Sequence, residues 1–414
     1  MNGDLDEGPE PVRMGPLRQA FSALRNPNYR YFYFGQTLSL IGTWTRTSAL
    51  GWIAYQFTHS AFLLGVVFML NALPLLVFST YAGALADRVP KIRIFTFTSW
   101  FSLASSASLG VMLFLGPVHI AYLMVFALLW GLSTAFEMPA RQTLMVELVG
   151  KRDLVNAIAL NSAMVNSTRV VGPAVGAMLI HAVGAPWCFM VDAFSYLAVL
   201  YGLGKIQLPA SHYTPRRVVA SWDHTMEGFR YMRTNPRIAT AIALMAVMSL
   251  GGWAYQSQLS AFVVSQLHQD VKVYGWLYAM NGLGACTAAF FVATQGARIV
   301  HTGTLFVGAG LYSLFIILFG FMNHPLGAAM LLFFAGFGII LCFSVGNSIV
   351  QTLSPDHLRG RLMGIWALVF GGGMPLGSFW MGLMAQRTTS GFALQIGGAF
   401  CAAGAAVVYV TLRS

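Results

Sequence analysis

Residues 61–93 read AFLLGVVFMLNALPLLVFSTYAGALADRVPKIR, and this stretch decides the fold. The part from 61 to 85 is predominantly apolar, whereas the next eight residues include one acidic and three basic side chains. Because an α-helix rises about 1.5 Å per residue, the apolar part is long enough to cross the ~30 Å hydrocarbon core of a bilayer. The stretch predicts a membrane-spanning helix that ends in a charged turn at the membrane surface.

The same apolar pattern recurs along the whole chain. A window of about twenty residues, which is the length that a spanning helix needs, finds twelve such segments. They cover residues 30–57, 61–85, 94–115, 118–140, 155–181, 187–205, 237–262, 273–294, 302–322, 326–350, 360–384 and 391–411. We therefore predict an all-α membrane protein with twelve transmembrane helices.

Composition argues against a soluble fold. The 414 residues are 57% hydrophobic and 9% charged, whereas a soluble domain carries about 25% charged residues. The first ten residues are acidic and lack the basic flank, apolar core and cleavage motif of a signal peptide, so we expect a tail there. The four cysteines stand singly in apolar segments without metal-ligand spacing. Neither a metal site nor a cofactor is predicted.

The basic residues indicate how the chain is oriented in the membrane. The formal net charge is +11, which by itself would suit a nucleic-acid partner. If the segments alternate from a cytoplasmic N-terminus, however, twenty of the 24 Lys and Arg residues lie on the cytoplasmic side, and only Lys272 and Arg387 lie outside. Cytoplasmic loops of membrane proteins are enriched in Lys and Arg. We therefore expect both termini in the cytoplasm and no nucleic-acid partner.

One polar interruption divides the chain into two similar halves. Asn71-Ala72-Leu73 recurs as Asn281-Gly282-Leu283, 210 residues later, and Trp44 corresponds to Trp253 with an offset of 209. Similar spacing in several helix pairs is the signature of a parallel repeat, an architecture of transporters with a central cleft. The predicted units are a cytoplasmic tail (1–29), a six-helix bundle (30–206), a cytoplasmic linker (207–236) and a second six-helix bundle (237–414).

Glycine and proline occur inside two corresponding segments, the fifth and the eleventh. Such residues either bend a spanning helix beside a cleft or allow neighbouring helices to pack closely, and both interpretations stay open. The predicted positions are Gly172, Pro173, Gly176, Pro375 and Gly377.

Residues 83–93, GALADRVPKIR, resemble the signature G-x-L-a-D-r-x-g-r-k-x-x of the major facilitator superfamily, with Pro90 where glycine is usual. The resemblance implies two six-helix bundles that transport by alternating access. It also implies a cytoplasmic gate toward the eleventh helix, formed by Gly83, Asp87, Arg88, Arg93 and Arg141. The alternative is that these charges only anchor the helix ends.

Two further stretches refine this resemblance. Gly172-Pro173-x-x-Gly176 is similar to the end of the antiporter motif of that superfamily, although the upstream glycines are absent. Gly42-Thr43-Trp44 with Gly51-Trp52, and residues 161–176, resemble the branch of the enterobactin exporter and macrolide-efflux proteins. The implied activity is efflux.

Ionisable residues inside the apolar segments are candidate functional residues, because a charge at the bilayer centre costs about 2.5 to 3.5 kcal/mol. We expect Asp192 to neutralise Arg169 on the neighbouring helix, which would leave Arg46 to meet the substrate. Asn166, Tyr255, Gln256 and Gln258 complete the predicted substrate-binding set, although each could instead join helices.

The membrane-embedded carboxylates, Asp192 and Glu137, are the candidate proton carriers. Glu137 also stands four residues before Arg141, the spacing of a local ion pair on a helix. The two alternatives for Glu137, coupling and a local pair, stay open.

We predict a monomeric secondary active transporter of a bacterial inner membrane, driven by protons. Its substrate is expected to be an amphipathic and anionic small molecule of the siderophore type, with drugs, macrolides and lysophospholipids as alternatives. A membrane enzyme is the rival from another class, but no nucleophile–base pair, carboxylate pair or phosphate-binding loop is present in the sequence.

Overall fold

The computed structural model describes residues 22–207 and 222–412, and this part of the chain consists of helices joined by short turns. The helices of the first half are α2 (Pro27–Thr58), α3 (Ala61–Arg88), α4 (Lys91–Leu115), α5 (Ile120–Ala182) and α6 (Pro186–Lys205), preceded by the short η1 (Ser22–Arg25). Those of the second half are α7 (Trp222–Thr234), α8 (Pro236–Val247), η3 (Met248–Gly252), η4 (Trp253–Ser257), α9 (Leu259–Ser265), α10 (Val271–Gln295), η5 (Gly296–Ile299), α11 (Thr302–Gly320), α12 (Pro325–Leu353), α13 (Asp356–Arg387) and α14 (Ser390–Leu412).

Polar residues in the turns start many of these helices. The side chains of Asn26, Ser60, Asn235 and Asp270 accept hydrogen bonds from backbone N–H groups in the first turns of α2, α3, α8 and α10. These N–H groups have no partner inside the helix, so a side-chain acceptor at this position fixes where the helix begins.

Eleven helices in the described part are long and apolar enough to cross a membrane. The first predicted segment, α2, has 32 residues and thus the required length, but it is less apolar. The reason is that α2 carries buried polar side chains on its inner face, among them Gln36, Ser39, Thr45 and Arg46.

Three features of the helices and their connections differ from the expected ones. The fourth and fifth segments join directly in α5, where Gly150 takes a φ of 66° that favours glycine. The seventh segment is not one α-helix, because a π-helical and a 3-10 turn, η3 and η4, separate α8 from α9. The predicted linker 207–236 also contains the amphipathic helix α7, whose Glu227 forms an ion pair with Arg361 of α13.

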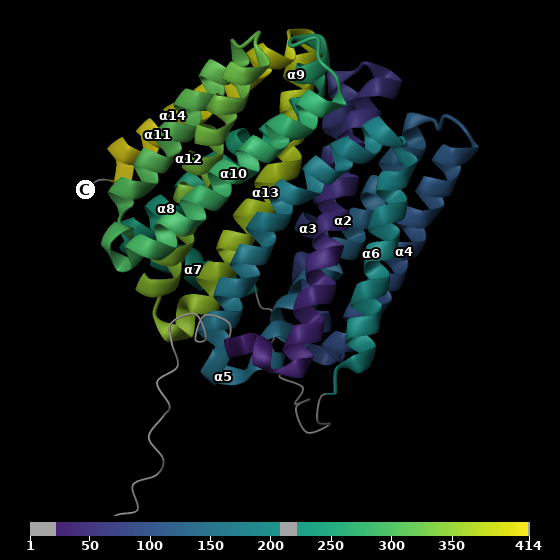
Figure 1. Cartoon of the computed structure of the whole chain (residues 1–414). Coiled ribbons are helices and arrows are strands. Elements are labelled where there is room, and N and C mark those ends of the chain that lie inside the picture. The colour runs from purple at the N-terminus through teal and green to yellow at the C-terminus, as the bar shows by residue number, and fades with distance from the viewer. Residues whose placement is uncertain (1–21, 208–221, 413–414) are drawn as a thin grey trace, which may run out of the picture.

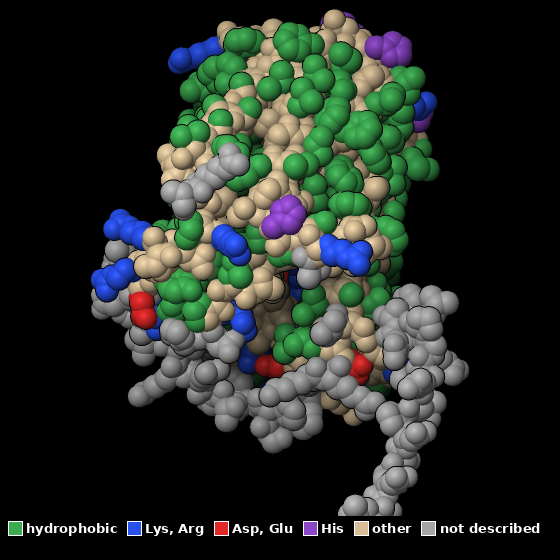
Figure 2. Space-filling view, turned by 90° about the vertical axis from the view of Figure 1, so that its left-hand side faces the viewer, with side chains coloured by type: hydrophobic (Ala, Val, Ile, Leu, Met, Phe, Trp, Pro, Cys, Tyr) green, Lys and Arg blue, Asp and Glu red, His purple; other side chains and the backbone are tan. Residues whose placement is uncertain are grey.

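The turns define two ends of the molecule. The basic end carries the turns after α3, α6, α10 and α12, whereas the opposite end carries the turns after α2, α4, α5, α11 and α13. Most of the visible Lys and Arg side chains lie near the basic end, where the surface is also hollowed (Figure 2).

The two halves stand side by side and meet along α3 with α13 and along α5 with α10 (Figure 1). Glycines make these crossings close: a Cβ on Gly65 would lie 2.5 Å from the Ser378 carbonyl oxygen, and one on Gly275 would lie 2.1 Å from Ala177 Cβ. Both crossings are therefore too tight for a side chain at these positions.

The halves are joined at the opposite end and separate toward the basic end. Hydrogen bonds between described residues join the halves nearer the opposite end, for example Ser60 Oγ to Gln386 Oε1 at 2.9 Å and Ser260 Oγ to the Gly51 carbonyl at 2.8 Å. Toward the basic end, a Cβ on Gly83 of α3 or Gly364 of α13 would meet nothing within 4 Å. This conformation is open at the basic end.

Candidate functional site

A buried ion pair joins α2 and α6 inside the first half. Arg46 Nη1 lies 2.8 Å from Asp192 Oδ2, and the two residues are 4% and 0% exposed. Ser106 Oγ of α4 donates to the same carboxylate oxygen at 2.6 Å, and Trp130 Nε1 of α5 donates to Ser106 Oγ at 3.1 Å. Trp130 also lies under the Arg46 guanidinium, 4.3 Å from ring centroid to Cζ. The cluster ties four helices together and leaves no net charge.

The expected pair of Asp192 with Arg169 is therefore wrong, and so is the expectation that Arg46 is the unpaired arginine. The cause is the packing of α6 on α2. A Cβ on Gly42 would lie 2.9 Å from Asp192 Cα, so the glycine lets the two helices approach closely. Asp192 then lies beside Arg46, one helical turn beyond Gly42 on α2.

Arg169 on α5 lies where the two halves meet. Its Cζ atom is 5.2 Å from the ring centroid of Trp44 on α2 and 5.0 Å from that of Trp253 on η4. Within residues 22–207 and 222–412, no acidic side chain pairs with it, and its buried Nε atom has no hydrogen-bond partner. Cation–π contacts of this kind contribute about 0.5 to 2 kcal/mol each, and they stabilise the buried charge without neutralising it.

The two tryptophans that flank Arg169 occupy equivalent positions of the repeat. Trp44 and Trp253 are the residues that the offset of 209 pairs between the first and seventh segments. Trp44 also contacts Tyr278 of α10, with ring centroids 6.5 Å apart. The irregular turn η4 carries Trp253 to this position. A single cation thus lies between aromatic rings from both halves.

The predicted polar residues of the second half are buried and hydrogen-bonded. Tyr255 donates through its hydroxyl to Asn281 Oδ1 at 2.6 Å, and Gln256 Oε1 accepts from the Tyr278 hydroxyl at 3.1 Å. Gln258 Nε2 donates to the Ala61 carbonyl of α3 at 3.4 Å, a contact between the halves. For Gln258 the structure thus shows the helix-joining alternative.

Asn166 lies one helical turn before Arg169 on α5 and is partly exposed. Its side-chain amide donates to the Ser162 carbonyl of the same helix at 2.8 Å, which leaves the amide oxygen available. Among the residues predicted to bind substrate, Arg169 and Asn166 are the two with partly exposed side chains.

The expected gate residues lie at the basic ends of their helices. Glu137 and Arg141 form the expected i,i+4 pair with a distance of 3.9 Å, and Lys91 pairs with Glu147 at 2.8 Å. Asp87 belongs to the last turn of α3, but its side chain is outside the described part of the structure. Arg88 and Arg93 are exposed there. The contact of this cluster with α13 stays a prediction.

The glycine and proline cluster acts in close packing. The backbone angles of α5 and α13 stay helical through Pro173 and Pro375. A Cβ on Gly172 would lie 2.3 Å from Trp44 Cβ, one on Gly176 would lie 2.5 Å from Ser48 Oγ, and one on Gly377 would lie 2.3 Å from the Leu250 carbonyl oxygen. The packing interpretation of the three glycines is thus the one seen, and Gly172 fixes Trp44 close to α5.

Sequence reasoning missed the aromatic partners of both arginines. The sequence marks Trp44 and Trp253 as equivalent positions of the repeat, and this equivalence is the signal that identifies them as partners of one site. Ser106 and Trp130 had no comparable signal, because a serine and a tryptophan in apolar helices are common packing residues.

A two-part helical fold, closed at one end and open at the other around a buried charge, defines a membrane transporter that works by alternating access. The chain matches the family model described as transmembrane secretion effector over residues 18–413, and it belongs to this family of the major facilitator superfamily.

Comparison with known proteins agrees with this assignment. The chain is 25% identical to the staphyloferrin A transporter of Staphylococcus aureus over 370 residues, which cover 86% of this chain and 89% of the relative. It is 25% identical to the multidrug efflux pump Tap of Mycolicibacterium fortuitum, covering 82% and 84% of the two chains. It is 24% identical to the enterobactin exporter of Escherichia coli, covering 90% of each.

The fold is similar to that of a solved bacterial homologue of the human lysosomal transporter Spinster in an inward-facing conformation. The TM-score is 0.74 at 15% identity, covering 96% of this chain and 98% of the other. The protein is accordingly an integral membrane transporter of small molecules, and the predicted all-α fold of the major facilitator type is confirmed.

Proposed function

We propose that this transporter exports an amphipathic, anionic small molecule, and that Arg169 binds the anionic group. One observation carries the proposal: Arg169 lies between Trp44 and Trp253 without an acidic partner in the described part of the chain. An anion supplied by the substrate would neutralise this charge, in surroundings where Coulomb interactions are stronger than in water.

The neighbours of Arg169 suit the rest of such a molecule. Trp44, which is partly exposed, offers aromatic surface beside Arg169, and Asn166 offers an amide oxygen one turn away. A small-molecule site typically combines apolar walls with a few placed polar groups. Carboxylates, catecholates and phosphates on an aromatic or aliphatic body are the chemistry that fits. The siderophore transporters among the relatives support this class, and the multidrug pump keeps neutral drugs as the competing class.

Coupling to protons is part of the proposal. Asp192 is fully buried and Glu137 is partly buried, and each is held by an arginine of the first half, Arg46 or Arg141. A proton that neutralises either carboxylate would release its arginine and change the packing of α2 or α5. This gives protonation a structural consequence in the half that also carries Arg169.

The distribution of the basic residues supports an orientation in the membrane. We propose that the basic end faces the cytoplasm of a bacterial inner membrane, so that both termini are cytoplasmic and this conformation is inward-open. Residues 30–206 and 237–414 would move as two units, and the protein would work as a monomer that carries its substrate unchanged, without enzymatic conversion.

The proposal is tested with pairs of probes that differ only in charge. Purified protein is titrated with an amphipathic aromatic carboxylate and with its methyl ester, and binding is followed by thermal shift. We expect the carboxylate to bind at least tenfold more tightly, a difference of about 1.4 kcal/mol. Arg169→Gln should remove this preference and Arg169→Lys should keep part of it.

Arg298→Gln is the matched control, because Arg298 is an exposed arginine of η5 outside the central site. It should bind both probes as the unchanged protein does. Equal binding of carboxylate and ester by the unchanged protein, or a preference for a quaternary ammonium analogue, would overturn the anionic substrate class. It would favour the multidrug alternative.

A further inference from the structure

A second binding surface lies on the membrane-facing side of the first half. A groove of about 350 Å³ lies between the basic ends of α3 and α4 and the first half of α5, and its lining includes Leu85, Phe97, Phe101, Leu132 and Phe136. Residues of the second half and of the central site are not part of the lining. The groove is therefore separate from the substrate path proposed above.

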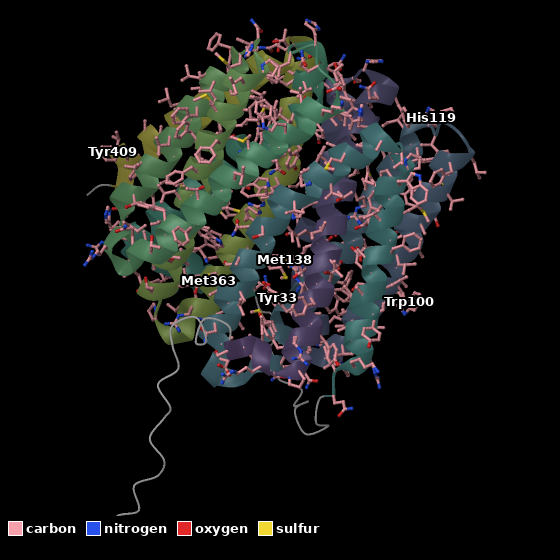
Figure 3. All side chains as sticks on the ribbon, in the orientation of Figure 1. Tyr33, Trp100, His119, Met138, Met363 and Tyr409 are labelled. Atoms are coloured by element: carbon pink, nitrogen blue, oxygen red, sulfur yellow. The ribbon has the colours of Figure 1, made fainter. Side chains whose placement is uncertain are left out.

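The outer surface of α4 faces away from the other half. Phe97 is 71% exposed, and Trp100, one turn further along α4, lies at the edge of the molecule farthest from the second half (Figure 3). In a membrane protein such exposed apolar side chains contact lipid. The groove thus opens toward the acyl chains of the bilayer.

The groove offers almost no polar group to water. Its two hydroxyls are used within the protein: Thr98 Oγ1 donates to the Phe95 carbonyl at 3.1 Å, and Ser133 Oγ contacts both Ser102 Oγ at 2.7 Å and the Thr98 carbonyl at 3.1 Å. A buried water needs two to four polar partners, so the groove requires an apolar occupant.

Arg93 is the exception to this apolar lining. It stands in the first turn of α4 at the basic end, and its side chain is exposed. Lys91 and Arg141 nearby are paired with Glu147 and Glu137, whereas Arg93 forms no ion pair within the described ranges. A cation thus marks the surface end of a groove that is otherwise shaped for hydrocarbon.

We infer that the groove binds one anionic phospholipid, with an acyl chain along Leu85 and Phe136 and the phosphate at Arg93. The sidedness proposed above places this lipid in the cytoplasmic leaflet. Basic pockets between transmembrane helices on that side bind anionic head groups, and a juxtamembrane Lys or Arg contributes to their attraction. A zwitterionic lipid would fill the groove without supplying net charge to Arg93.

Native mass spectrometry tests this inference. Purified protein is equilibrated with equal amounts of dioleoyl phosphatidylglycerol and dioleoyl phosphatidylcholine, and the retained lipid is identified. We expect the unchanged protein to retain one phosphatidylglycerol at least fivefold more often than phosphatidylcholine. Arg93→Gln should lose this preference, whereas Arg298→Gln, with an exposed arginine removed at the same end, should keep it.

A second variant tests the apolar lining of the groove independently of the charge at its surface end. Leu85→Trp fills the apolar part and leaves Arg93 in place, so it should also reduce retention of phosphatidylglycerol. Each variant is used only if its thermal stability in phosphatidylcholine equals that of the unchanged protein. If Arg93→Gln is less stable, Arg93→Ala, which also removes the positive charge, replaces it. Equal losses in Arg93→Gln and Arg298→Gln, or full retention in Leu85→Trp, would show general lipid contact only and overturn the inference.

Discussion

At the scale of single residues, the two intramembrane arginines have different environments and should tolerate substitution differently. Arg46 forms an ion pair with Asp192 and lies over Trp130, and Ser106 links these two residues by hydrogen bonds. The Arg169 guanidinium instead lies beside the rings of Trp44 and Trp253, and no described acidic side chain pairs with it. Charge alone made the two indistinguishable in the sequence. Their surroundings support the proposed roles, which are structural for Arg46 and substrate-binding for Arg169.

Arg46→Ala should lower stability more than it alters specificity. It leaves Asp192 buried without its counter-charge, and breaking a buried pair in this way costs about 3 to 5 kcal/mol. We expect a large loss of folded yield and of thermal stability. Arg46→Ala with Asp192→Ala should recover part of it, because no unpaired charge remains. A stable Arg46→Ala protein that fails only in transport would contradict this assignment.

At the scale of elements, glycines on one helix have opposite surroundings. Gly65 of α3 touches the backbone of α13 near the opposite end, whereas Gly83 of the same helix has open space at the basic end. The difference reflects the conformation, because α3 and α13 cross closely at one end and diverge at the other. The same helix therefore serves as a tight joint and as one wall of an opening.

Gly65→Ala and Gly83→Ala form a matched pair. A Cβ at Gly65 would lie 2.5 Å from the Ser378 carbonyl oxygen, so we expect a loss of about 1 to 3 kcal/mol, as in other overpacked sites. Gly83→Ala should keep or slightly raise thermal stability, since alanine favours helices, yet slow transport if this end closes during the cycle. A destabilised Gly83→Ala protein with unchanged transport would argue against a gate at this position.

At the scale of the whole molecule, the contacts at the opposite end should have to break for transport. They include Ser60 with Gln386 and Tyr274 with the Ser48 carbonyl, and they connect the two halves. Alternating access requires that this end opens while the basic end closes. Among the described residues, few hydrogen bonds join the halves at this end, which suits a joint that opens repeatedly.

A reversible cross-link tests this movement. Ser60→Cys with Gln386→Cys, in a chain whose four native cysteines are replaced, should react in intact cells with an impermeant bifunctional thiol reagent that contains a disulfide. Transport of the bound anionic probe should stop and return after reduction, because the cross-link holds the opposite end closed. Single-cysteine variants should keep transport. Full cross-linking without loss of transport would contradict the proposed opening of this end. Absence of reaction with the impermeant reagent would contradict the proposed orientation, in which this end faces outside.

The sequence by itself determined the fold class, because the length and apolarity of each segment are local properties that the bilayer selects directly. It also determined the membrane position of Arg46, Arg169 and Asp192, and the 71–73 and 281–283 repeat that relates the halves. Only the tertiary structure decided which arginine meets Asp192. That choice depends on Gly42, which allows α6 to approach α2. The tertiary structure also decided the surroundings of Arg169, because the turn η4 brings Trp253 beside it. Pairing between helices depends on their rotation and distance, and periodicity along a single chain does not contain either quantity.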